Sequence, residues 1–227
     1  PLPPFAFTGH RTCGGQAAAA LRATVGELYA RGFRTFLCGM AMGFDLAAAE
    51  AVLACRDSET GSAFSPASAP DPHFPHTPMP GLRLVAVIPF RGQESRFPAV
   101  DRERFRRVLA AADHSVTLSP SYHAGCYAVR NNYLVEHAAL LVAWYDGSPG
   151  GTHYTVRRAL GRGLEFINLH PHPVALRPAE PTLFSHPSDS EAMYCTALSG
   201  PYFLLSPFDF LPSLSGLLLL SSSFLLP

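Results

Sequence analysis

The sequence predicts an α/β protein in which a parallel sheet lies between layers of helices. Short apolar runs alternate with amphipathic segments from residue 5 to residue 169, a pattern typical of βαβ units. The run 82–88 is almost continuously apolar, which indicates a strand buried on both faces. Hydrophobic residues make up 48% of the 227 residues and charged residues 15%, a balance that suits a packed core rather than a disordered chain.

The first part of the chain predicts three strands and two helices. Residues 5–7 are a short strand that ends at Thr-Gly, and 16–31 is a helix with apolar residues at helical spacing and a glycine stop. A strand at 35–38, a glycine-containing loop at 39–43 and an alanine-rich helix at 44–56 follow, before the strand 82–88.

The second part continues the same alternation. We expect helices at 98–112, 127–137 and 152–162, the first of them rich in arginine. Strands are expected between and after them, at 115–118, 140–144 and 166–169. We therefore expect one domain over 1–170.

Two segments break the pattern. Residues 58–80 are rich in Pro, Ser, Ala and His and predict an inserted surface loop. Residues 171–227 are a Pro/Ser/Leu-rich tail without clean periodicity, which we expect to be poorly ordered rather than a second domain. The uncharged stretch 210–227 is at the lower limit of a membrane span and contains Pro and Gly, so a membrane partner is not expected.

Composition excludes several kinds of chemistry. All 17 basic residues are Arg, so mechanisms that need a lysine amine are excluded: a pyridoxal Schiff base, a Ser-x-x-Lys acylase, a lysine-based kinase and a Walker loop. The 17 acidic residues balance this charge, which argues against a protein that coats DNA with a basic face.

The cysteines and histidines predict no metal site. The five cysteines are dispersed and contain no C-x-x-C pair, which indicates a reducing, cytoplasmic location. No signal peptide is visible. The pairs His73/His76 and His170/His172 lack Cys or carboxylate companions, so no metal is expected.

Three polar loops follow predicted strands, and parallel sheets bind ligands at the carboxyl ends of their strands. Thr8-Gly9-His10-Arg11 offers a turn and an arginine fork suited to phosphate or carboxylate. The loop from Gly39 to Gly43 lacks the dinucleotide pattern G-x-G-x-x-G, but its glycines allow close approach of an anion. Asp45 either caps the helix behind it or accepts from a ribose hydroxyl.

The third loop runs from Asp146 to Thr152 and contains Pro-Gly-Gly-Thr at a helix start, which offers amides and a hydroxyl to a phosphate. Arg130 and Asn131 lie in the middle of a predicted helix, where Asn is a poor helix former. A ligand is one candidate partner for them, and a solvated helix face is the alternative.

Five motifs in this order resemble the SLOG superfamily, most closely its YpsA-like branch. They are Phe-Thr-Gly-His-Arg at 7–11, Gly-Met-Ala-Met-Gly-Phe-Asp at 39–45, Val-Ile-Pro-Phe at 87–90, Arg-Asn-Asn-Tyr-Leu-Val at 130–135 and Asp-Gly-Ser-Pro-Gly-Gly-Thr at 146–152. The resemblance covers about residues 5–170. It implies a Rossmann-like three-layer sandwich and a nucleotide or nucleotide-derived ligand.

The superfamily also includes the LOG phosphoribohydrolases and the DNA-processing protein DprA. LOG enzymes carry a catalytic Glu in P-G-G-x-G-T-x-x-E, and the matching position here is Arg157. The resemblance therefore implies phosphate binding without LOG-type cleavage.

We expect a domain that binds or senses a nucleotide or its derivative, and no cofactor is expected. A homo-oligomer is possible. The residues expected to contact the ligand are Thr8, Gly9, His10, Arg11, Gly39, Gly43, Asp45, Arg130, Asn131, Asp146, Gly150, Gly151 and Thr152. One alternative is a nucleoside monophosphate hydrolase or N-glycosidase that uses Asp45, Glu50 or His10. Another is DprA-like binding of single-stranded DNA, ranked last because the charge is balanced.

Overall fold

A six-stranded parallel sheet forms the centre of the described structure. The coordinates are a computed structural model, and they describe residues 2–13, 15–57 and 78–172. The strand order is β4-β3-β2-β1-β5-β6, and every neighbouring pair is parallel. The strands are β1 (Phe5–Gly9), β2 (Thr35–Cys38), β3 (Arg83–Ile88), β4 (His114–Thr117), β5 (Leu140–Trp144) and β6 (Glu165–Asn168).

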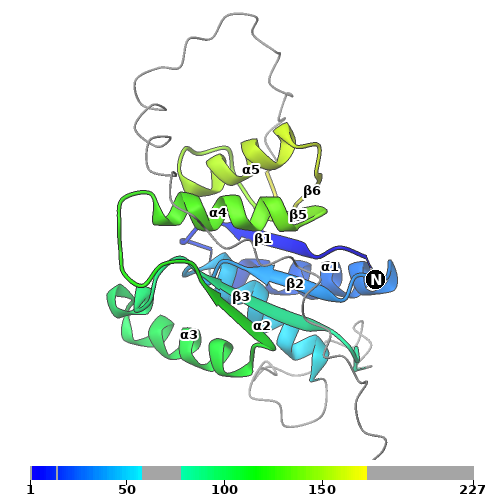
Figure 1. The fold of residues 1–227 in the computed structure, drawn as a ribbon. Coiled ribbons are helices and arrows are strands. Elements are labelled where there is room, and N and C mark those ends of the chain that lie inside the picture. The colour runs from blue at the N-terminus through cyan, green and yellow to red at the C-terminus, as the bar shows by residue number, and fades with distance from the viewer. Residues whose placement is uncertain (1, 14, 58–77, 173–227) are drawn as a thin grey trace, which may run out of the picture. The chain divides into compact units, whose positions relative to one another are not determined.

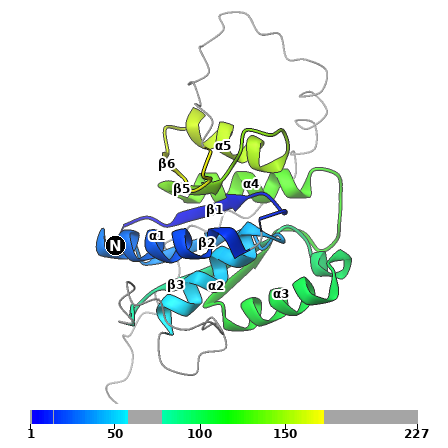
Figure 2. The same cartoon turned by 180° about the vertical axis from the view of Figure 1, so that it is seen from behind.

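Helices cover both faces of the sheet, which confirms the predicted α/β sandwich. One layer contains α1 (Ala18–Ala30), α2 (Phe44–Arg56) and α3 (Ala99–Ala111), and the other contains α4 (Cys126–His137) and α5 (Gly151–Gly161). Figures 1 and 2 show α1 and α2 on one side of β1 and α4 on the other.

The strands alternate between the two cores because successive side chains point to opposite faces. In β1, Phe5 and Phe7 pack against the layer of α1 and α2, and Ala6 packs against the layer of α4 and α5. β5 alternates in the same way and is buried along most of its length. The edge strands β4 and β6 are more exposed and more polar, as edge strands usually are.

The predicted elements are present, with shifts of one or two residues at most ends. Two ends differ by two residues: β1 extends to Gly9, and the first α-helix begins at Ala18 because Gly15–Ala17 form a 3₁₀ turn. A second 3₁₀ turn, Gln93–Arg96, was not predicted.

Two predictions concern residues beyond the described ranges. The predicted insertion 58–80 lies outside the described residues except for 78–80, and the predicted tail lies outside them from residue 173 onward. The chain divides into two units, Pro1–Leu183 and Phe184–Pro227, and the six-stranded sheet with its helices belongs to the first.

Candidate functional site

The strand order places a switch point between β1 and β5. The chain leaves β1 through α1 on one face of the sheet and leaves β5 through α5 on the other face. In open parallel sheets, such a divergence opens a crevice at the carboxyl ends of the strands. All thirteen predicted site residues lie at this edge: at the end of β1, in the loops that follow β1, β2 and β5, or in the first two turns of α2, α4 and α5.

Two of the predicted glycines allow the loops after β1 and β2 to pack on each other. A Cβ at Gly9 would overlap the ring of Phe44, and a Cβ at Gly43 would overlap the backbone carbonyl of Arg11. Gly43 also has a φ of +76°, which favours glycine. The Phe44 N–H donates to the His10 carbonyl at 3.3 Å, so a hydrogen bond joins the two loops.

Gly39 makes room for an arginine from the opposite helix layer. Arg130 of α4 donates from Nη1 to the Gly39 carbonyl, and a Cβ at Gly39 would occupy the place of the guanidinium. The same Nη1 lies 3.3 Å from Oδ2 of Asp45, in the first turn of α2. Arg130 therefore joins the two helix layers across the carboxyl edge of the sheet.

The Arg130–Asp45 pair is buried, with exposed fractions of 6% and 3%. Burial raises the pKa of Asp45 to about 6, although Arg130 and the Ala41 N–H, which donates to Oδ2 at 3.2 Å, favour the charged form. Arg130 Nε finds no hydrogen-bond partner among the described residues. Of the two alternatives for Asp45, the capping role is wrong, because the cap position is Gly43 and α2 has no side-chain cap.

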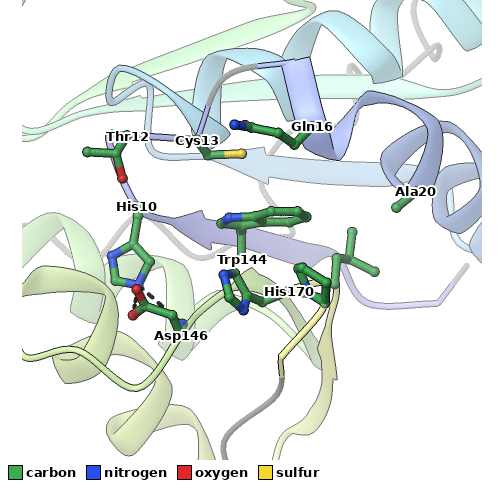
Figure 3. Close-up of a pocket in the computed structure, with 10 residues that line it drawn as sticks. His10, Thr12, Cys13, Gln16, Ala20, Trp144, Asp146 and His170 are labelled. Atoms are coloured by element: carbon green, nitrogen blue, oxygen red, sulfur yellow. Dashed lines mark hydrogen bonds and ion pairs between the residues drawn. The ribbon is translucent and has the colours of Figure 1, made fainter.

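A second polar contact crosses the switch point itself. His10 Nε2, after β1, lies 2.8 Å from Oδ1 of Asp146, after β5. Hydrogen bonds from Ser148, including its N–H at 2.9 Å, lower the pKa of Asp146 to about 2. Figure 3 shows this pair at the rim of a cavity.

The cavity has a volume of about 520 Å³, which is in the usual range for small-ligand sites. Its walls come from the loop after β1, the start of α1, the end of β5 and the residues after β6. The indole of Trp144 lies across its centre between Gln16 and His170 in Figure 3, and the Trp144 and His170 rings are 5.1 Å apart. Sequence reasoning included His10 and Asp146 of this lining but missed Trp144, Gln16 and His170.

The first turn of α5 follows an exposed glycine turn. Gly150 precedes the helix with a φ of +139° and is exposed, and no side chain caps α5 or any other described α-helix. Two contacts fix the position of this turn: Asn131 Nδ2 donates to the Gly151 carbonyl at 3.4 Å, and Tyr145 Oη lies 2.5 Å from His153 Nδ1. Thr152 is 7% exposed. Uncapped amides at a helix start, together with the helix dipole, attract anions.

Neither a metal cluster nor a membrane span is found in the described part of the chain. No three His, Cys, Asp or Glu side chains there are grouped as metal ligands would be. Within the same residues, no helix combines the length and apolar character needed to cross a membrane.

Comparison with known proteins supports the fold. No protein-family model matches the chain. UPF0398 proteins of Bacillus cereus (strain B4264) and Bacillus thuringiensis (strain Al Hakam) are 32% identical over 94 residues, which is 40% of this chain and 50% of each relative. The chain thus matches about half the length of these curated relatives.

Two solved structures match the chain over more than two thirds of its length. DNA processing protein A (DprA) from Streptococcus pneumoniae has a TM-score of 0.51 at 19% identity, over 73% of this chain and 49% of that one. DprA from Helicobacter pylori, whose structure concerns its single-stranded DNA binding mode, has a TM-score of 0.47 at 14% identity, over 72% and 63%. The first likeness shows that the chain shares the α/β fold of this DprA structure. The SLOG superfamily and its YpsA-like branch stay predictions.

Proposed function

We propose that this chain binds a nucleotide or nucleotide-derived ligand at the carboxyl edge of the sheet, with a phosphate at the start of α5. The observation that carries the proposal is the open first turn of α5, which begins beside the switch point and has no side-chain cap. A phosphate there would accept hydrogen bonds from backbone amides and from the Thr152 hydroxyl.

Arginine supplies the positive charge that such a ligand needs. The chain has no lysine, and Arg11 is exposed in the loop after β1. Arg130 already contacts the Gly39 carbonyl and the Asp45 carboxylate. We therefore assign it a structural role at the carboxyl edge of the sheet. Arg11 is therefore the better candidate for direct contact with phosphate oxygens.

The surroundings of Arg157 and Glu50 agree with binding without LOG-type cleavage. Arg157, at the position of the LOG glutamate, is exposed on α5. Glu50 forms ion pairs with Arg104 at 2.8 Å and Arg107 at 3.6 Å, which supports a structural role in joining α2 to α3.

Hydrolysis of a nucleotide is the second candidate, and the raised pKa of Asp45 favours it. A carboxyl group with a pKa of about 6 is suited to general acid catalysis near neutral pH. Release of free base from nucleoside monophosphates by the wild type, and its loss in Asp45→Asn, would establish this activity in place of binding alone.

The proposal predicts that a nucleotide stabilises the protein through the α5 site. Thermal unfolding of the full chain with AMP and with ribose 5-phosphate measures this, because a ligand at a hundred times its Kd adds about 2.7 kcal/mol. Thr152→Ala and Arg11→Ala should reduce the increase in Tm, and Thr152→Ser should retain most of it.

Arg162→Ala is the matched control, because Arg162 is exposed at the opposite end of α5. Equal stabilisation of the wild type, Thr152→Ala and Arg11→Ala would show that the site is misplaced.

A further inference from the structure

Three aromatic rings gather on the carboxyl edge beyond Arg11. Phe90 follows β3, Tyr122 lies between β4 and α4, and Tyr127 is in the first turn of α4. Phe90 contacts both tyrosines edge to face, with ring centroids 5.4 Å and 5.8 Å apart. The two tyrosine rings are 6.5 Å apart. We call these three residues the aromatic platform.

The platform presents its tyrosines outward and its phenylalanine inward. Phe90 is 5% exposed, and Tyr122 is 52% exposed. Tyr127 is half-buried. A large exposed ring on a buried aromatic support is a flat, rigid surface that loses little conformational entropy when a second flat group stacks on it.

Each tyrosine is paired with an exposed arginine. The guanidinium of Arg96 lies over one face of the Tyr122 ring, 5.1 Å from its centre, and that of Arg11 lies over one face of the Tyr127 ring, 5.6 Å from its centre. Aromatic faces with adjacent cations match a ligand that joins a flat π system to a negative charge. A nucleotide has this chemistry, because its base stacks and its phosphate pairs with Arg.

The platform is next to the proposed phosphate site. Tyr127 and Asn131 are four residues apart on α4, so they are neighbours on one helix face, with Cβ atoms about 6 Å apart. Asn131 in turn donates to the carbonyl of Gly151, in the first turn of α5. One turn of α4 therefore separates the aromatic rings from the residue that contacts the α5 start.

We propose that the aromatic platform is a nucleobase-stacking subsite, with Tyr122 and Tyr127 as the stacking rings and Arg11 and Arg96 as cations for the attached phosphates. This inference rests on the proposed function and adds a site for the base, which is the part of the nucleotide that the α5 site does not recognise. Stacking tolerates any base, so the base can come from a free nucleotide or from a single strand.

Calorimetric titration of the full chain with ribose 5-phosphate, AMP and oligothymidylate tests the platform. AMP should bind about tenfold more tightly than ribose 5-phosphate, since the base adds a stacking contact. Tyr122→Ala should remove that advantage without changing the affinity for ribose 5-phosphate, and Tyr122→Phe should keep it. Arg96→Ala should weaken AMP binding, in contrast to the control Arg162→Ala.

The outcomes separate this inference from the proposed function. If ribose 5-phosphate binds but AMP gains nothing over it, and Tyr122→Ala matches the wild type with every base-bearing probe, the platform is wrong and the phosphate site stands. Tyr122-dependent binding that Thr152→Ala leaves unchanged supports the platform and contradicts the α5 site. If AMP binds with an affinity that depends on Tyr122, the ligand is a free nucleotide. If only oligothymidylate binds, with an affinity that falls steeply as salt rises, the ligand is a single strand. Either result supports base stacking on the platform. Absence of binding by all three probes overturns both proposals.

Discussion

Arg130 shows how a single residue connects parts of the fold that are distant in sequence. It lies in the second turn of α4, but its guanidinium reaches the end of β2 and the first turn of α2. Both Arg130 and Asp45 are buried, so the Coulomb attraction between them offsets a large loss of hydration. Leaving one charge buried without the other is therefore unfavourable.

We predict that Arg130→Ala lowers the free energy of unfolding by about 3 kcal/mol, since breaking a buried pair typically has this effect. Urea unfolding measures the change. The matched control is Arg158→Ala, whose pair with Glu136 is exposed at 40% and 43% and should contribute less than about 1 kcal/mol. Similar losses in the two variants would mean that the Arg130–Asp45 pair contributes no more than a surface pair.

At the scale of the element, the start of α5 depends on a backbone conformation that only glycine adopts readily. Gly150 has φ +139° and ψ −164°, a region that residues with a Cβ avoid. Gly161, the last residue of the same helix, has helical geometry, and a Cβ there would meet no atom within 4 Å. The two positions form a matched pair in one helix.

We predict that Gly150→Ala destabilises the protein by about 1–3 kcal/mol, because the folded backbone is strained by any Cβ. Gly161→Ala should instead stabilise it by about 0.5–1 kcal/mol, since alanine loses less entropy in a helix. Chemical unfolding of both variants checks the signs. A neutral Gly150→Ala would show that the loop relaxes to another conformation.

The order and type of the helices and strands could be predicted from the sequence, because buried strands and amphipathic helices have different apolar periods. The 3₁₀ turns at Gly15–Ala17 and Gln93–Arg96 could not, since they are short and have no repeating pattern.

The same limit applies to the site. The loops after the strands could be located, because parallel strands bring their carboxyl ends to one edge. The cavity around Trp144 and the platform around Phe90 could not, since each joins segments that are far apart in the chain.

At the scale of the whole molecule, two carboxylates at the site change stability with pH in opposite directions. The pKa of Asp146 is lowered from 3.8 to about 2, so its contribution is present above pH 4 and is lost as the pH falls through about 2. The pKa of Asp45 is raised from 3.8 to about 6, so the folded state binds its proton more tightly than the unfolded state does. Asp45 therefore destabilises the fold progressively as the pH rises from about 4 to about 6.

We predict that Asp45→Asn removes this loss. Between pH 4 and pH 6 the stability of the wild type should fall relative to that of Asp45→Asn by about 2 kcal/mol, which is most of the roughly 3 kcal/mol that corresponds to the whole change in pKa. Urea unfolding of both proteins at several pH values across the interval measures the difference. Asp146→Asn is the control, because its difference from the wild type should change little over the same interval and mainly at lower pH. A wild type that gains stability relative to Asp45→Asn between pH 4 and pH 6 would mean that Arg130 and the Ala41 amide outweigh burial, and that Asp45 is an ordinary ionised partner instead of a candidate acid.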